Sequence, residues 1–586
     1  MIVKMKKASI IVQAKDASPA IKGLRSLGLM HVQNQKAPSG KDINALQEEI
    51  NLTSQALEVI SEAEFATGCE GTLARSGITD WKTTCRHIID IWKRLDQLEE
   101  FSSGLNEKIK EWEIWGDFQP QDFQHLADQG VYIKLYQLPK KDLGLFPEGV
   151  ALEQLAEKKN MVYCAAISRE QFSCPLKEIE LPKMSLGHMR SRIDEDRRII
   201  EAIRDDLRSL FCYQPQLRSI KSSLEKELEF QQALCGMADE GSLNYLTGYI
   251  PFDAQEALAG LAKKEQWGLL ISEPSEDDTV PTLIRNPKWV SLINPVFKLL
   301  EIIPGYRELD ISILFLIFFS LFFGIIIGDA GYGLIYFTLT LFIERKFGRK
   351  IKDKTVFFLF YALSFCAIIW GFLTATFFGQ EWLAGIGIKP LVPLLNDMKF
   401  IQAFCLFLGA FHLSLAHVWR AVIKSPALAA LADIGWISIL WAGFFLAKTL
   451  ILGDGFPNFT KWLIIAGVFA VILFTNPQRN ILKMLGVGLA TLALSLVNSF
   501  TDVVSYIRLF AVGLAGVAIA DTVNVLSKDA GGNIIIMALI VILGHSMNII
   551  LGPMSVLVHG IRLNVLEFSG HAGITWSGVE FKPLRE

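Results

Sequence analysis

Hydrophobic and polar positions divide the 586-residue chain into two unlike halves. Between residues 311 and 568, 28 of 258 positions are charged, about 11%, and apolar stretches long enough to cross a bilayer follow one another. The other 328 residues hold 89 charges, about 27%, which is typical of a water-soluble domain. The pattern therefore predicts a cytosolic domain, residues 1–290, followed by a transmembrane domain, residues 291–586.

The charged half predicts two α/β lobes. A strand, a helix ending at Gly28 and a second strand occupy residues 1–40. Further β-type runs begin near residues 131, 161, 243 and 267. We expect one lobe to combine residues 1–40 with 240–280, and the other to be built from residues 115–180.

Apolar positions in heptad spacing predict that a long antiparallel helical coiled coil joins the two lobes. Three stretches show the spacing: Ile43, Leu46, Ile50, Thr53, Leu57 and Ile60; Ile91, Leu95, Leu98, Ser102, Leu105, Ile109 and Trp112; and Ile193, Ile200, Ile203, Leu207 and Leu210. Pro215 is expected to bend or interrupt the returning helix.

The second half predicts an all-α polytopic membrane domain of about eight transmembrane helices. Their expected spans are residues 311–328, 329–344, 355–378, 400–422, 428–452, 461–475, 485–527 and 533–568. The glycine-rich turn GDAGYG, residues 328–333, joins the first two. The expected fold of the whole chain is therefore mixed, with both α/β lobes before the membrane helices.

Basic residues in the loops predict how the spans are oriented. The loops after spans two, four and six carry ten: Arg345, Lys346, Arg349, Lys350, Lys352, Lys354, Arg420, Lys424, Arg479 and Lys483. The loops on the other side carry five: Lys389, Lys399, Lys448, Lys461 and Lys528. Because basic loops stay in the cytoplasm, both termini are expected there. The N-terminal MIVKMKKASIIV agrees, since it has no signal-peptide pattern.

The last two spans are too long to cross a bilayer at right angles. The seventh, residues 485–527, would measure about 65 Å as a helix, against a hydrocarbon core of about 30 Å. Either it breaks at Asn498–Asp502 or it is one steeply tilted helix. The tilted helix is favoured because residues 490–512 contain no proline and no glycine pair. The eighth span is similarly long, with a kink expected at Pro553.

Two arginines, Arg508 and Arg562, lie inside these two spans. A guanidinium keeps its proton in a protein, and at hydrocarbon depth it costs from about 3 to well over 10 kcal/mol. Arg508 could snorkel only to a helix end within about two turns. Arg562 lies nearer a terminus, where a structural ion pair with Glu567 would also account for it. Together they predict a polar, ion-handling interior.

Several kinds of site are excluded. The sequence has no GxxxxGK[ST] phosphate-binding loop, so the chain is not an ATP-hydrolysing subunit. The eight cysteines show no CxxC pair and no zinc-ligand spacing, so reduced thiols and no metal site are expected. They are Cys69, Cys85, Cys164, Cys174, Cys212, Cys235, Cys366 and Cys405. Asp329 is expected to cap a helix or turn, and His412, His417 and Asp433 to form interhelical hydrogen bonds.

Six stretches resemble the a/I subunit family of V-type ATPases, the ion-channel stator subunit. In chain order they are PGYRELD, FFGIIIGDAGYG, LGAFHLSLAHVW, DVVSYIRLFAVGLA, LVHGIRLNVLEF and WSGVEFKPL. The fourth and fifth resemble the family's last two membrane helices, and the sixth resembles its C-terminal tail. With the lobes and coiled coil, the resemblance covers the whole chain.

The resemblance implies a non-catalytic subunit of a rotary ATPase or ATP synthase, with no cofactor. In such a machine ions enter one aqueous half-channel, bind a carboxylate on a rotating proteolipid (c/K) ring and leave by another half-channel. Arg508 matches the family's essential arginine, which favours the ionised carboxylate and blocks leakage between the half-channels. Arg562 matches its second membrane arginine. The candidate half-channel linings are Asp502, Ser505, His559 and Glu567.

The implied partners are the proteolipid ring, E/G-type peripheral-stalk coiled coils, a central-stalk adaptor and the lipid bilayer of a prokaryotic inner membrane, with no nucleic acid. Gly516 and Gly552 depart from some eukaryotic members, which carry a histidine and a glutamate there. A proton relay through those two side chains is therefore excluded. The transported ion, proton or sodium, is not fixed by this chain because the binding carboxylate lies on the ring.

Two other functions stay open. A self-contained secondary transporter or channel with a cytosolic regulatory domain would be expected to show internal repeats, and none is evident across the eight spans. A membrane-anchored coiled-coil scaffold would leave the cost of Arg508 unexplained. Co-purification with an ATPase head and a proteolipid ring would separate the stator from the transporter.

Overall fold

The computed structural model describes residues 1–62, 80–147, 149–158, 161–349, 351, 353–380, 390–477, 480–529 and 533–585. Cys69 and four of the basic loop residues, Lys350, Lys352, Lys389 and Arg479, lie outside the described residues. Contacts divide the chain into two compact units. The first contains Met1–Ile10, Leu29–His31 and Thr247–Pro583, and the second contains Ile11–Gly28, Val32–Leu246 and Leu584–Glu586. The functional division at residue 290 stays a prediction.

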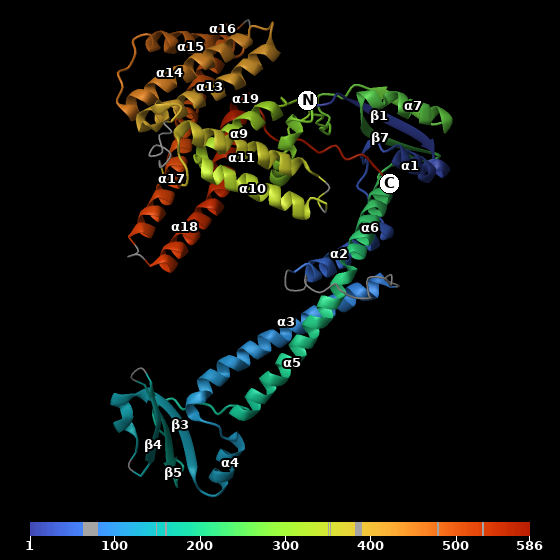
Figure 1. Ribbon diagram of the computed structural model, residues 1–586. Helices are drawn as coiled ribbons and strands as arrows, with labels where there is room; N and C mark the ends of the chain where they lie inside the picture. The colour runs from blue at the N-terminus through green and yellow to red at the C-terminus, as the bar shows by residue number, and fades with distance from the viewer. Residues whose placement is uncertain are drawn as a thin grey trace. The chain divides into compact units, whose positions relative to one another are not determined.

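A five-stranded sheet takes its strands from residues far apart in the chain, as predicted for the first lobe (Figure 1). Its order is β2-β7-β1-β8, with β6 beside β7. The strands are β1 (Met5–Gln13), β2 (His31–Gln33), β6 (Ala238–Glu240), β7 (Leu243–Pro251) and β8 (Gly268–Ser272), with α1 (Ala17–Leu27) and α7 (Gln255–Lys264) between them in sequence. Gly28 ends α1 in the left-handed conformation (φ 65°), which glycine adopts without a steric penalty.

The second lobe is a three-stranded antiparallel sheet in the order β3-β5-β4. Its elements are α4 (Pro120–Asp128), β3 (Tyr132–Pro139), β4 (Ala151–Lys158) and β5 (Met161–Ser168). The predicted strands at residues 131–138 and 161–168 are confirmed as β3 and β5. Tyr136 and Cys164 pair across them and are buried, and this burial raises the pKa of both side chains.

Four long helices pack in two antiparallel pairs, α2 with α6 and α3 with α5, and the second pair adjoins the second lobe (Figure 1). They are α2 (Lys41–Ile60), α3 (Trp81–Trp112), α5 (Leu186–Leu210) and α6 (Gln214–Cys235). Arg190 pairs with Glu113 at 2.9 Å, and Arg204 pairs with Glu99 at 2.7 Å. Glu113 lies in the 3₁₀ turn directly after α3. The two pairs are 14 residues apart along both segments, in opposite directions, and this interval is two heptads. The supercoil itself stays a prediction.

The returning helix is interrupted between α5 and α6. Pro215 lies in the first turn of α6, directly after a 3₁₀ turn over Phe211–Tyr213, so the predicted interruption is confirmed. Cys212, in the same turn, is disulfide-bonded. The expectation of reduced thiols is therefore wrong at Cys212, because cysteine spacing along the sequence does not reveal which thiols meet in the fold. The other described cysteines are free.

Long apolar helices make up most of the first unit. They are α9 (Ser312–Ile327), α10 (Ala330–Phe347), α11 (Thr355–Thr374), α13 (Met398–Lys424), α14 (Ala430–Leu452), α15 (Thr460–Phe474), α16 (Ile481–Ser505), α17 (Ile507–Lys528) and α18 (Ile534–Ser555). Within the described residues, five stretches are long and apolar enough to cross a membrane: Thr355–Thr374, Met398–Lys424, Ala430–Leu452, Ile481–Lys528 and Ile534–Ala572. Two shorter apolar helices, α9 and α15, coincide with two further predicted spans. The count of eight stays a prediction.

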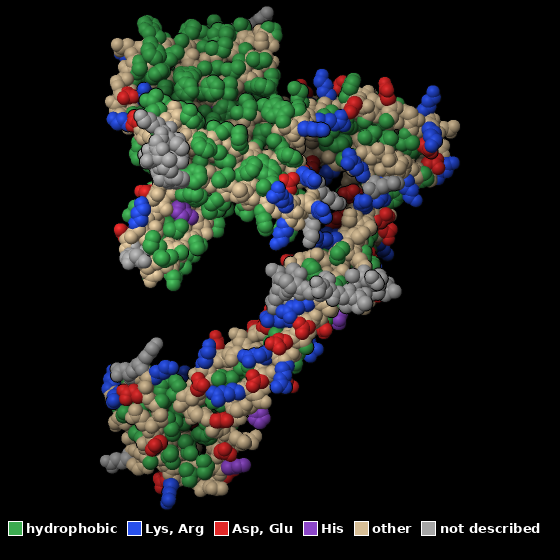
Figure 2. All heavy atoms as spheres, in the orientation of Figure 1, with side chains coloured by type: hydrophobic (Ala, Val, Ile, Leu, Met, Phe, Trp, Pro, Cys, Tyr) green, Lys and Arg blue, Asp and Glu red, His purple; other side chains and the backbone are tan. Residues whose placement is uncertain are grey.

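Exposed hydrophobic side chains cover these helices. Figure 2 shows them gathered over α14, α15 and α16. Trp462 keeps 72% of its surface exposed and Leu482 keeps 83%. Apolar surface on this scale is unfavourable in water and matches the hydrocarbon of a bilayer.

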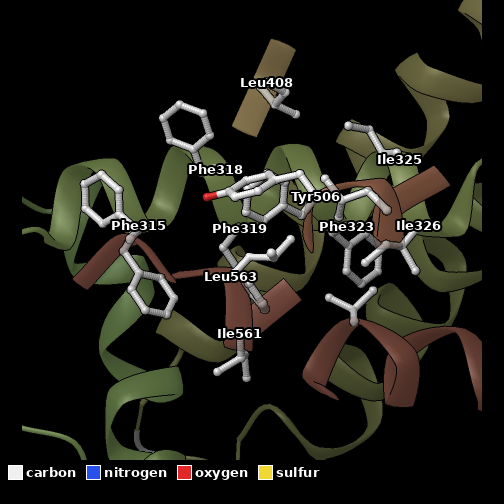
Figure 3. Close-up of a cluster of buried hydrophobic side chains, with 14 of the residues drawn as sticks. Phe315, Phe318, Phe319, Phe323, Ile325, Ile326, Leu408, Tyr506, Ile561 and Leu563 are labelled. Atoms are coloured by element: carbon white, nitrogen blue, oxygen red, sulfur yellow. The ribbon is translucent and has the colours of Figure 1, made fainter. Parts of the chain in front are cut away.

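The predicted seventh span is interrupted at one residue, Tyr506, between α16 and α17. The alternative break at Asn498–Asp502 is not found, since those residues lie inside α16. Tyr506 keeps helical dihedral angles (φ −69°, ψ −16°) and is fully buried. Its ring lies edge-on to Phe322 of α9, with ring centroids 5.9 Å apart, in the buried cluster shown in Figure 3. Its hydroxyl is hydrogen-bonded to His412 Nδ1 of α13 at 2.8 Å. The junction is therefore fixed by packing, while the tilt stays a prediction.

The C-terminal tail returns to the segment that precedes α9. Thr282 N donates to Val579 O at 2.7 Å, and Gly578 N donates to Ile303 O at 3.0 Å. Thr575 donates to Glu308 Oε1 from its backbone N, at 2.8 Å, and from its hydroxyl, at 2.5 Å. The tail is thus held by backbone and side-chain hydrogen bonds.

Candidate ion-handling site

Three residues that the sequence predicts as site residues lie around the carboxylate of Glu567. Ser505 Oγ donates to Glu567 Oε1 at 3.1 Å. Arg562 Nε lies 3.4 Å from the same oxygen, and Arg508 Nη1 lies 3.9 Å from it. We call Ser505, Arg508, Arg562 and Glu567 the arginine cluster. The cluster contains two guanidinium groups and one carboxylate, so its formal charge is about +1.

The backbone around Arg562 explains why it meets Glu567. Residues Val556–Gly560 and Leu563–Phe568 are π-helical, and the first segment begins three residues after Pro553. A π-helix bonds residue i to residue i+5, so side chains five apart, such as Arg562 and Glu567, come onto one face. Pro553 has no N–H to donate, and it lies in the last turn of α18, just before the backbone changes from α-helical to π-helical.

The two arginines remain accessible while the carboxylate does not. The exposed fraction of the side chain is 54% for Arg562, 24% for Arg508 and 5% for Glu567. His559 lies in the π-helical segment Val556–Gly560, three residues before Arg562. Around them Leu557, Val558 and Leu566 are exposed. The positively charged side chains of the cluster are therefore exposed on a surface that is otherwise apolar.

Asp502 belongs to a different group of residues. Its Oδ2 is 3.1 Å from His571 Nε2, and His571 Nδ1 is 3.0 Å from His417 Nε2. His417 Nδ1 is in turn 3.1 Å from Asp433 Oδ1. We call these four residues the histidine chain. Lys424 Nζ donates to Asp433 Oδ2 at 2.7 Å.

A cavity of about 460 Å³ contacts the histidine chain. Its lining is mostly polar and comes from α13, α14, α16, the short helix α19 (Ser569–Ala572) and Thr475 at the end of α15. The lining residues are His417, Arg420, Lys424, Ala432, Asp433, Trp436, Thr475, Thr491, Ser495, Asn498, Ser499, Asp502, Gly570 and His571. The volume is large enough for several water molecules.

A third polar group lies beside Gly516. Tyr332 Oη is 2.7 Å from His545 Nδ1, and Asn548 Nδ2 donates to Tyr332 Oη at 3.1 Å and to Gly516 O at 2.9 Å. His545 Nε2 is 3.1 Å from Asn524 Oδ1. Polar side chains of α10, α17 and α18 thus form a connected group next to Gly516.

The sequence predicted part of this arrangement. Asp329 caps α10 by accepting from Tyr332 N at 3.0 Å, as expected, and His412, His417 and Asp433 form the expected interhelical hydrogen bonds. The pairing of Arg508 with Glu567 was not predicted, because the two lie in different spans. His571, His545 and Tyr332 were missed, although a histidine or tyrosine inside an apolar stretch is itself a signal.

The fold and the site define a membrane protein whose apolar helices enclose a buried carboxylate flanked by two arginines. The chain is 30% identical to V-type ATP synthase subunit I of Borreliella burgdorferi over 617 residues, covering all of both proteins. It is 29% identical to V-type ATP synthase subunit I 1 of Treponema pallidum over 626 residues, again covering all of both. A-type ATP synthase subunit I of Methanocaldococcus jannaschii is 27% identical over 58% of this chain and 55% of its own length.

These similarities show that the chain belongs to the V-type ATP synthase subunit I family. No family model matches the sequence. One similar solved structure is the cytoplasmic N-terminal domain of a V-ATPase subunit I, at 13% identity and a TM-score of 0.22, covering 45% of this chain and 99% of that one. The family assignment depends on the sequence relatives.

Proposed function

We propose that this subunit I is the non-catalytic membrane stator of a rotary V-type ATPase or ATP synthase. It forms two half-channels for proton or sodium ions against a rotating proteolipid ring. Its cytosolic lobes and coiled coil bind E/G-type peripheral stalks and resist torque. The protein is multi-pass, and both termini lie in the cytoplasm.

The observation that carries this proposal is the unbalanced charge of the arginine cluster. Glu567 neutralises one guanidinium and leaves one positive charge in an apolar environment, where charge is costly unless it has a partner. A carboxylate arriving on a ring subunit would supply that partner, and it would be held ionised while it faced Arg508. The surrounding apolar side chains are suited to a ring of membrane helices.

The polar groups on either side of the cluster support two separate ion paths. The cavity with Asp502 lies beside Arg420 and Lys424, whose loop is expected in the cytoplasm, so it is the candidate for the cytoplasmic half-channel. The group of Tyr332, His545 and Asn548 is the candidate for the opposite half-channel. Arg508 lies between Asp502 of the first group and Gly516 of the second in the sequence, where it would block a direct passage of ions.

The test is Arg508→Ala in the complete complex, reconstituted into liposomes. ATP-driven ion transport should be lost, while the ATPase head and the proteolipid ring still co-purify with the mutant subunit. Arg349→Ala, at an exposed arginine after α10, is the matched control and should keep transport. Retained transport by the Arg508 variant, or a wild-type chain that purifies alone and transports a solute, would refute the stator.

A further inference from the structure

Another cavity, of about 660 Å³, lies where the C-terminal tail meets the segment that precedes α9. We call it the tail pocket. Small-molecule sites in proteins have volumes of about 300–1,000 Å³, so the tail pocket is large enough for an organic ligand. Part of its lining is apolar and comes from Leu283, Phe297, Ile302 and Phe581.

The walls of the tail pocket carry two lysines and two glutamates. One wall is the end of the short helix α8 (Asn294–Leu300), where Lys298 and Glu301 line the pocket. The other wall is the tail, where Glu580 and Lys582 line it. The formal charges of the four side chains sum to zero, and each wall carries both signs. Charge complementarity therefore favours a ligand with one anionic and one cationic group over a simple anion or cation.

These four charges are accessible to a ligand. All four residues are exposed, and neither Lys298 nor Glu301 forms an ion pair with a described residue. Lys582 Nζ lies 3.3 Å from Glu580 Oε2, but their side chains keep 74% and 55% of their surface exposed. An ion pair this exposed contributes little stability, so a ligand can replace it at little cost.

The backbone of Glu301 is in an uncommon conformation for a residue with a side chain. Glu301 ends α8 with φ 53° and ψ 30°, in the left-handed region that glycine adopts most readily. Strained residues of this kind are concentrated at functional and ligand-binding positions. This conformation singles out the Glu301 carboxylate as a binding group of the tail pocket.

The tail pocket lies at the level where the apolar helices begin. Phe297 packs edge-on against Phe315 in the first turn of α9, with ring centroids 5.1 Å apart, and α8 also contacts α11. Trp289, just before α8, and Leu299, within it, keep 55% and 68% of their surface exposed. Exposed tryptophan and leucine next to a membrane span are typical of the boundary between water and lipid. A ligand in this pocket can therefore extend its apolar part into the bilayer.

The aromatic side chains of the pocket do not form a cage for a quaternary ammonium group. The Phe297 ring packs against Phe315 and Trp576, and the Phe581 ring lies 6.0 Å from the His31 ring. Choline recognition requires several aromatic faces turned toward the cation. The two carboxylates of the pocket, in contrast, accept hydrogen bonds from an N–H group. A primary ammonium group therefore fits the pocket better than a choline.

We propose that the tail pocket binds a zwitterionic phospholipid with a primary ammonium group, of the phosphatidylethanolamine type. The phosphate oxygens accept hydrogen bonds from Lys298 and Lys582. The ammonium group donates to Glu301 and Glu580, and an acyl chain lies along Leu299. The bound lipid connects the tail to α8 at the membrane boundary. This inference does not depend on the proposed ion transport.

The test uses the full-length protein, purified in mild detergent and stripped of bound lipid, with one lipid added at a time. Native mass spectrometry measures binding, and the rise in unfolding temperature checks it. Phosphatidylethanolamine should bind at least about 10-fold more tightly than phosphatidylcholine or phosphatidylglycerol with the same acyl chains. Glycerophosphoethanolamine, which has the same headgroup and no acyl chains, should bind more weakly than the lipid.

The variant Glu301→Gly separates binding from folding. Glycine suits the left-handed backbone, so without lipid this variant should unfold at or above the wild-type temperature. Its affinity for phosphatidylethanolamine should nevertheless fall at least about 10-fold. Glu580→Gln and Lys298→Gln should show the same loss. Glu256→Gln and Lys263→Gln, at exposed residues of α7, are the matched controls and should bind like the wild type.

Three results would overturn the proposal. The first is a folded Glu301→Gly protein that binds phosphatidylethanolamine as tightly as the wild type. The second is equal affinity for the three lipids, or tighter binding of phosphatidylglycerol. The third is equal affinity for glycerophosphoethanolamine, which would mean a site for a soluble phosphate ester. Each of these results leaves the proposed stator function intact.

Discussion

Glu567 Oε1 lies 3.9 Å from Arg508 Nη1, although the two residues belong to different membrane spans. The same oxygen is 3.4 Å from Arg562 Nε, so one buried carboxylate holds both arginines. This arrangement joins α17 to the π-helical end of the last span at the point where the charge is concentrated. It makes Glu567 as important to the site as either arginine.

Replacing Glu567 by glutamine should therefore destabilise the membrane unit. The amide keeps a partner for Ser505 but leaves two guanidinium groups without their counter-charge. Because both arginines are partly exposed, we expect a loss of about 1–3 kcal/mol rather than the larger cost of a fully buried pair. Thermal unfolding in mild detergent would measure it, with Glu276→Gln in an exposed loop as the control. An unchanged unfolding temperature would show that the carboxylate is dispensable.

The junction at Tyr506 should depend on Gly409. A Cβ atom at Gly409 would come within 2.7 Å of the Tyr506 ring, which is too close for an ordinary contact. Gly409→Ala should lower stability by about 1–3 kcal/mol, because the buried ring has no room to move. Gly486→Ala in α16 is the matched control, since nothing lies within 4 Å of its Cβ position. Equal unfolding temperatures for the two variants would contradict the packing described here.

The register of α3 against α5 can be tested by exchanging charges. Glu99→Arg places two arginines together and should lower stability, and adding Arg204→Glu should restore it. The coupling should be about 0.2–1 kcal/mol, since both side chains are a third or more exposed. Combining Glu99→Arg with Arg190→Glu should bring no recovery, because Arg190 pairs 14 residues away with Glu113. A double-mutant cycle on the purified protein gives the answer, and recovery with the wrong partner would mean a different register.

The attachment of the C-terminal tail should weaken in acid. Burial raises the pKa of Glu308, but hydrogen bonds from Thr575, Gly305 and Trp576 outweigh it, and the net pKa is below the ordinary value. A carboxyl with a lowered folded pKa contributes stability above its unfolded pKa of about 4.3, and the contribution is lost as pH falls through the folded value. Hydrogen exchange at the Thr575 amide should therefore lose protection below about pH 4. In Glu308→Gln the exchange should show no such step.

The sequence predicted those features that depend on periodicity and local turn chemistry. Strands β1, β3, β5 and β7, the heptad helices and the Asp329 cap all follow from short stretches of sequence. Features made by distant residues were not accessible. Nothing near Asp502 points to His571, and nothing near Arg508 points to Glu567, because each partner is brought in by the return of the last span. The π-helical segments were also missed, since residues 556–568 have an ordinary apolar pattern.

The C-terminal tail connects the last membrane helix to the segment that precedes the first one. Residues 575–581 continue from the last membrane helix and are bonded to Thr282, Ile303 and Glu308, which precede the first one. A pull on the end of the last span therefore reaches the entrance of the first directly, without passing through the helices between. If a torque acts on the protein, the first and last spans would therefore move together. The two arginines would then keep their positions relative to the other membrane helices.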